Sequence, residues 1–135
     1  MNNKLLGILE SLENKIKSSY EIGVTMEEAE KLAAEFLHAQ LLVSNELKVV
    51  DLDARMQKSG FKAVTATVYL EIIAKSDKKP TESNIEAVIN TTKLVQDSRD
   101  QLDTAEVNRD SLQNYLSIFK EAHVYFRGIA KGRFE

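Results

Sequence analysis

Apolar side chains recur along most of the chain at the spacing of helices. Between residues 3 and 20 they are spaced by four, three and four positions, which places them on one face of an amphipathic helix. Gly23 follows and predicts the end of this helix. The face is formed by Leu5, Leu9, Leu12 and Ile16.

The longest periodic segment covers residues 25–75 and alternates between three and four positions, which is a heptad repeat. Thr25 and Glu28 fit a capping box at its start. Gly60 interrupts the segment and predicts either a kink or the end of a helix. One position of the repeat is polar, Gln40. The apolar positions are Ala29, Ala33, Phe36, Val43, Leu47, Val50, Ala54, Phe61, Val64 and Val68.

The run at residues 64–68 is rich in β-branched side chains, which are typical of a strand. We favour a helix, because the heptad phase carries through Gly60 into this run and a single strand would lack a partner. A second apolar flank on the same helix predicts contact with more than one neighbour. It comprises Leu32, Leu37, Leu42, Val49 and Met56.

A turn at residues 76–81 separates this helix from the rest of the chain. Pro80 disfavours helix in the preceding residue, and Thr81 can cap a short helix over residues 81–90. A second heptad segment predicts a long helix over residues 94–127, and residues 128–135 are expected to leave it as a basic and aromatic tail. Its repeat runs through Val95, Ser98, Leu102, Ala105, Arg109, Leu112, Leu116, Phe119, His123 and Phe126.

The pattern therefore predicts an all-α fold in one domain, residues 1–135. We expect a long antiparallel helical hairpin of coiled-coil type with a shorter N-terminal helix. Two long helices leave apolar surface uncovered, so we also expect a homo-oligomer. The expected core or oligomer seam consists of Phe36, Val43, Leu47, Val50, Leu102, Leu112, Leu116 and Phe119.

Composition agrees with long helices and removes several function classes. The 135 residues include one proline, five glycines and no cysteine, which excludes disulfides, thiolate metal sites and a cysteine nucleophile. No glycine-rich phosphate loop, metal-spaced carboxylate pair or nucleophile elbow is present. We expect no enzyme activity, cofactor, metal or small-molecule substrate. Without a membrane-spanning run or signal peptide, we expect a cytoplasmic protein, inside the host cell if phage-encoded.

Four polar residues stand at positions that the heptads would bury. Gln40 and Ser98 are interpreted as residues that fix register. Arg109 is expected to reach solvent or to pair with an acid on a neighbouring helix, and Glu106 and Asp110 are close to it along its own helix. His123 is interpreted as a partly buried, hydrogen-bonded histidine, since catalysis would need a carboxylate or nucleophile that converges on it.

The charges are segregated along the chain, although the net charge is only −3. Residues 81–110 carry −4, whereas residues 58–79 and 117–134 each carry +3. Towards the C-terminus, aromatic residues alternate with cations, a combination that holds single-stranded nucleic acid. The aromatic residues are Tyr125, Phe126 and Phe134, and the cations are Arg127, Lys131 and Arg133. Docking of the tail on its own core or on a neighbouring subunit is the alternative. The candidate nucleic-acid-binding residues are Lys75, Lys78, Lys79, Arg127, Lys131, Arg133 and Phe134.

The order of these features resembles small phage-encoded helical proteins, in particular the UvsY-like recombination mediators. The resemblance rests on the alanine-rich helix that begins near Ala29, the lysine-rich turn at 78–81, the helix around Leu102 and Leu112, and the basic aromatic end at 126–135. It implies an oligomeric accessory factor that binds single-stranded DNA and helps to load a recombinase past a single-strand-binding protein. The acidic net charge and the division of the basic residues between two places depart from that pattern.

Two functions therefore remain open from the sequence. The first is a non-enzymatic, oligomeric helical factor that binds single-stranded DNA, a recombinase or both in phage recombination or replication. The second is a structural or adaptor coiled-coil protein that binds other proteins and no nucleic acid. A phage inhibitor of a host factor would belong to this second class.

Overall fold

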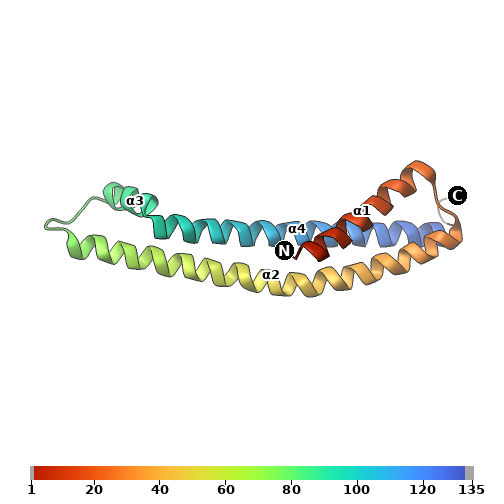
Figure 1. The fold of residues 1–135 in the computed structure, drawn as a ribbon, viewed down its shortest axis with the longest axis horizontal. Helices are drawn as coiled ribbons and strands as arrows, with labels where there is room; N and C mark the ends of the chain where they lie inside the picture. Colours follow the sequence, from red (N-terminus) through yellow and green to blue (C-terminus); the bar gives the residue numbers. More distant parts are fainter. Residues whose placement is uncertain (1, 133–135) are drawn as a thin grey trace. The chain divides into compact units, whose positions relative to one another are not determined.

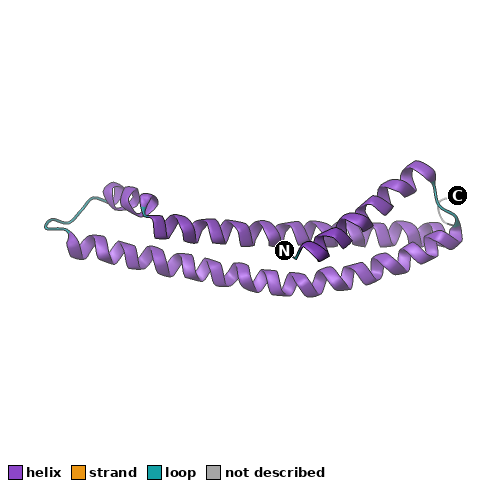
Figure 2. Cartoon of the chain, in the orientation of Figure 1, coloured by secondary structure: helices purple, strands orange, loops and turns teal. Residues whose placement is uncertain are grey.

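The computed structural model describes residues 2–132, which form helices joined by short connections (Figures 1 and 2). The helices are α1 (Asn3–Ile22), α2 (Met26–Lys75), α3 (Glu82–Thr91) and α4 (Lys93–Ala130). Helices α2 and α4 pack against each other, so the predicted all-α helical hairpin is confirmed. The described residues contain no strand, and residues 64–68 are helical as expected.

Local sequence accounts for the helix ends. The Asn2 side chain accepts a hydrogen bond from the Lys4 amide at the start of α1, and the Thr25 hydroxyl accepts one from the Glu28 amide at the start of α2. Gly23 ends α1 with φ 82°, a conformation that suits glycine. The Thr81 hydroxyl caps α3 by accepting from the Asn84 amide.

Helix α2 continues through Gly60, in agreement with the predicted helix over residues 25–75, and the alternative of a helix end at Gly60 is excluded. One boundary differs from the sequence-based expectation. Helix α4 continues past Arg127 to Ala130, and the expectation that residues from Gly128 onward leave the helix was wrong. The turn comes at Gly132, whose φ is 73° and whose amide donates to the Ile129 carbonyl. Gly128 is buried inside the helix instead.

The chain divides into two compact units. Unit 1 comprises Met1–Lys48 and Asp110–Glu135, and unit 2 comprises Val49–Arg109. Unit 1 therefore contains α1, the first part of α2 and the last part of α4. Unit 2 contains the rest of α2 and α4 together with α3.

Unit 1 is a three-helix arrangement around an aromatic core. The Phe36 ring lies 5.4 Å from the Phe119 ring and stacks on the Phe126 ring at 5.6 Å, and all three side chains are fully buried. Helix α1 adds Leu9 and Leu12 to this core. Outside it, the Lys15 ammonium forms an ion pair with the Glu35 carboxylate and so links α1 to α2 at the surface.

Unit 2 has a thinner core made of smaller side chains. Its buried apolar residues are Val50, Ala54, Val68, Ile85, Val95 and Ala105. The Arg99 guanidinium of α4 lies over the Phe61 ring of α2, 5.5 Å from the ring centre, and this cation–π contact joins the two helices. The Arg99 side chain also donates to the Asn90 side chain at 3.2 Å, and this bond connects α4 to α3.

The predicted seam residues divide into buried and half-buried sets. Phe36, Val43, Val50, Leu112 and Phe119 are buried. Leu47, Leu102 and Leu116 are half-buried. Most of the fully buried members belong to unit 1, where three helices surround the seam.

Candidate protein-binding face

Helix α2 carries a second heptad stripe in unit 2, and the whole stripe is exposed. It alternates between three and four positions and contains no charged residue. Three of its large side chains, those of Leu52, Met56 and Leu70, are 59%, 64% and 65% exposed. We call this stripe the α2 face, and it consists of Val49, Leu52, Met56, Ser59, Ala63, Ala66, Leu70 and Ile73.

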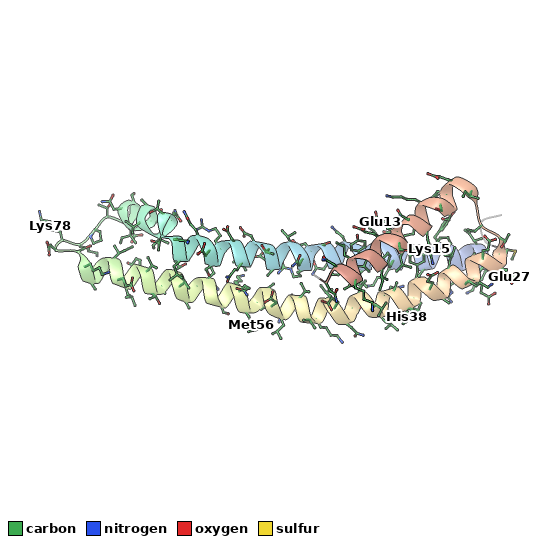
Figure 3. The ribbon with its side chains drawn as sticks, in the orientation of Figure 1. Glu13, Lys15, Glu27, His38, Met56 and Lys78 are labelled. Carbon is green, nitrogen blue, oxygen red and sulfur yellow. The ribbon has the colours of Figure 1, made fainter. Side chains whose placement is uncertain are left out.

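The α2 face lies on the side of the helix away from α4. Leu52, Met56 and Leu70 each follow a buried residue by two positions, which is about 200° around a helix. The buried residues are Val50, Ala54 and Val68. Figure 3 shows the same relation for Met56, which projects from the side of α2 opposite α4. Helix α2 thus has two apolar faces in unit 2, and α4 covers one of them.

The middle of the α2 face is built from small residues. Ser59, Ala63 and Ala66 project little beyond the backbone, so another helix can approach closely there. The nearby threonines satisfy their hydroxyls within α2. Thr65 donates to the Phe61 carbonyl at 2.8 Å and Thr67 donates to the Ala63 carbonyl at 2.9 Å.

Charged residues border the α2 face on both sides. Asp53 follows Leu52 on one border, whereas Arg55 and Lys62 precede Met56 and Ala63 on the other. In heptad terms the acid is at an e position and the bases are at g positions, which are the positions that select partner and orientation in coiled coils. The Arg55 guanidinium pairs with the Asp51 carboxylate at 3.0 Å on its own helix.

The sequence identified only part of this face. Val49 and Met56 belong to the second flank predicted for α2, and both are exposed. Leu52, Leu70 and Ile73 were not recognised as members, although they share the heptad phase of Val49 and Met56. These residues follow the buried heptad positions by two, and this regular offset is the sequence signal that identifies the whole face. The other predicted flank residues fall in unit 1, where Leu32 is half-buried and Leu37 and Leu42 are exposed.

The predicted nucleic-acid-binding residues fall into separate groups. Lys75, Lys78 and Lys79 are exposed at the end of α2 and in the following loop of unit 2. Figure 3 shows Lys78 in this loop. Arg127 and Lys131 are exposed at the end of α4 in unit 1. Arg133 and Phe134, which are also among the predicted residues, lie outside the described part of the chain.

The aromatic rings at the end of α4 contact the fold itself. The Tyr125 ring stacks on the Tyr20 ring of α1, with 5.5 Å between the ring centres. Phe126 is fully buried against Phe36. The Phe126 ring is therefore closed to a nucleotide base, and Tyr20 occupies one face of the Tyr125 ring.

The polar residues of the heptads have local roles. The Nδ1 atom of His123 lies 2.8 Å from the Ala33 carbonyl oxygen, which joins α4 to α2 within unit 1 by a hydrogen bond. His38, by contrast, is exposed. Arg109 pairs with Glu106 at 3.6 Å. Gln40 and Ser98 are half-buried, and the Gln40 amide nitrogen is buried without a hydrogen-bond partner among the described residues.

The Tyr115 phenol of α4 lies close to acidic side chains of α1. Burial raises the pKa of its phenol, and the negative charges of Glu13 and Glu10 on α1 raise it further, together with a hydrogen bond to Glu13. These contacts place the phenol in the α1–α4 junction of unit 1. A neutral hydrogen-bonding phenol in such a junction contributes to packing.

Within residues 2–132, no helix is both long enough and apolar enough to cross a bilayer. The same residues contain no cluster of three or more histidine, cysteine or acidic side chains that could hold a metal ion. Comparisons with known protein families, curated proteins and solved structures find no match to this chain.

Proposed function

We propose that the chain is a non-enzymatic helical adaptor that binds another protein by coiled-coil packing along the α2 face. One observation carries this proposal: in unit 2, an uncharged heptad stripe with large exposed side chains runs along the side of α2 that α4 leaves open. Contiguous exposed apolar surface of this kind marks interaction sites in proteins.

The chemistry of the α2 face indicates the class of partner. A heptad stripe with charged borders fits an amphipathic helix that presents its own apolar heptad. The small residues at the centre favour close backbone approach, and the larger side chains at both ends supply apolar area.

A site-specific cross-linking experiment tests this proposal. A photoreactive amino acid at Met56 is expected to cross-link to a polypeptide in extract of the cells that naturally produce the chain. The cross-linked peptide, identified by mass spectrometry, is expected to come from an amphipathic helix. The Leu52→Glu/Leu70→Glu variant should lose at least about tenfold in yield, since each buried charge opposes association.

Matched controls keep this experiment interpretable. The same photoreactive residue at Gln101, an exposed polar position of α4 in unit 2, should give little product. The control variant Gln101→Glu/Thr104→Glu adds the same charge on α4 and should retain the Met56 product. Equal yields at Met56 and Gln101 would contradict the proposed function.

A second candidate function is binding of single-stranded DNA, as in a recombination mediator. It is supported by Lys75, Lys78 and Lys79, which are exposed together at one loop and have no ion pair within the described residues. Three mobile cations can follow a phosphate backbone. In this candidate, Arg127, Lys131, Arg133 and Phe134 of unit 1 would make a separate contact with the strand.

Fluorescence anisotropy with a labelled oligonucleotide tests the second candidate. Binding should weaken steeply as salt rises, because phosphate contacts release counterions. The triple variant Lys75→Ala/Lys78→Ala/Lys79→Ala should bind more weakly than the control Lys4→Ala/Lys17→Ala/Lys31→Ala, which removes three exposed lysines elsewhere. Absence of binding at low salt would remove this candidate.

A further inference from the structure

We infer that the occupant of the α2 face is the α2 face of a second copy of this chain, with the two helices parallel and in register. This inference rests on the proposed function, because it names the partner of that face. It is argued from the charges that border the face, from the heptad itself and from the area that the face offers.

A parallel arrangement brings opposite charges together. In parallel coiled coils, a g residue faces the e residue five positions later on the other helix. Lys48, which immediately precedes the face on α2, then lies opposite Asp53 of the second copy, and the symmetry of the pair repeats this contact. The next g residues, Arg55 and Lys62, face the uncharged Gly60 and Thr67 of the second copy.

An antiparallel arrangement centred on the same face is less favourable. In this arrangement the apolar heptad positions of the two copies also meet, and Leu52 packs against Leu70 of the second copy. In antiparallel pairs, however, g residues face g residues. Lys62 would therefore lie across the symmetry axis from Lys62 of the second copy, and like charges at such positions oppose association. Charge thus selects the parallel pair.

The size of the face determines how strong the association should be. At about 1.5 Å rise per residue, the segment from Val49 to Ile73 is roughly 36 Å long. With a helix width of about 10 Å, the footprint is roughly 360 Å² on each copy. This is less than the ~800 Å² per partner of a standard stable interface, so we expect a reversible dimer with a dissociation constant on the order of 10 μM.

The absence of cysteine makes a direct test of geometry possible. A Leu52→Cys variant of the full chain should form disulfide-linked dimers readily under mild oxidation, because equivalent positions meet in a parallel, in-register pair. Asp103→Cys, an exposed position on α4 in unit 2, is the control and should cross-link at least about tenfold more slowly. A Leu52→Cys chain mixed with a Leu70→Cys chain should yield few mixed dimers.

Sedimentation equilibrium of the purified, cysteine-free chain completes the test. The mass should rise from monomer to dimer as concentration passes through roughly 10 μM, and Leu52→Glu/Leu70→Glu should remain monomeric. A chain that stays monomeric at about 100 μM would overturn the inference. So would predominant mixed Leu52–Leu70 dimers, or equal cross-linking of Leu52→Cys and Asp103→Cys. The proposed function would stand on its own if the chain were monomeric but cross-linked from Met56 to a different polypeptide, and if Leu52→Glu/Leu70→Glu abolished that product.

Discussion

Unit 1 and unit 2 use the same two long helices but bury very different amounts of apolar side chain. Unit 1 holds the Phe36 ring against those of Phe119 and Phe126, and α1 packs on this core. Unit 2 buries small residues such as Ala54 and Ala105, and the open side of its α2 carries the α2 face. The third helix of each unit differs: the 20-residue α1 adds Leu9 and Leu12 to the core of unit 1, whereas the 10-residue α3 adds Ile85 to the core of unit 2.

This comparison suggests a division of roles between stability and recognition. A segment whose core consists of small side chains has less apolar burial to offset the conformational entropy lost on folding. Pairing along the α2 face would give unit 2 the additional apolar burial that α1 gives unit 1.

The largest expected effect concerns the two cores. Phe36→Ala should destabilise unit 1 by about 3–5 kcal/mol, because it removes a fully buried ring between two others. Val68→Ala in unit 2 should cost about 1–2 kcal/mol, since it removes less buried volume. Urea unfolding followed by circular dichroism measures both. Equal losses would break the proposed contrast between the units.

The hydrogen bond between α4 and α2 in unit 1 offers a smaller test. His123→Ala should lower the free energy of unfolding by about 1 kcal/mol, because it removes the 2.8 Å contact of Nδ1 with the Ala33 carbonyl. His38→Ala, at an exposed position, should change it by less than about 0.5 kcal/mol. If both variants have the same stability as the unmodified chain, the contact does not contribute to unit 1.

Substitution of two exposed helical glycines can show whether the two units unfold independently. Gly7 in α1 and Gly60 in α2 are both helical, and a methyl group at either would meet no atom within 4 Å. Each change to alanine should stabilise its own unit by about 0.5–1 kcal/mol. In hydrogen exchange, Gly60→Ala should raise protection in unit 2 and Gly7→Ala in unit 1. Uniform protection changes across the chain would show that the units unfold together.

The smallest expected effect is a pH dependence confined to unit 1. Because the pKa of Tyr115 is raised in the folded chain, its contribution is fully present below the ordinary tyrosine pKa of about 10. Stability is lost as pH rises through the folded-state pKa. Spectrophotometric titration of Glu13→Gln should show a lower Tyr115 pKa, whereas an unchanged titration curve would contradict the assigned cause.

The helices were predictable from sequence because their signals are local. Heptad spacing, the Thr25 and Thr81 caps and Gly23 each act within a few residues. The end of α4 was missed because Gly128 resembles a helix terminator in sequence, yet it is buried in unit 1 and the helix continues to Ala130. A glycine can end a helix or permit close packing, and tertiary contacts decide between the two.

The α2 face was harder to predict for a related reason. Sequence shows that α2 has two apolar stripes, but only the fold shows which one α4 covers. Tyr125 and Phe126 looked suited to base stacking in sequence, since aromatic side chains near cations bind nucleotides. Their engagement with Tyr20 and Phe36 depends on contacts between residues far apart in the chain.

Hydrogen exchange of the unmodified chain at two protein concentrations tests the contrast between the units most directly. Exchange would be compared well below and well above roughly 10 μM, the expected dissociation constant. Amides from Val49 to Ile73 are expected to gain protection at the higher concentration, while those around Phe36 and Phe119 keep the same protection at both. Identical protection of the Val49–Ile73 segment at the two concentrations would contradict the account.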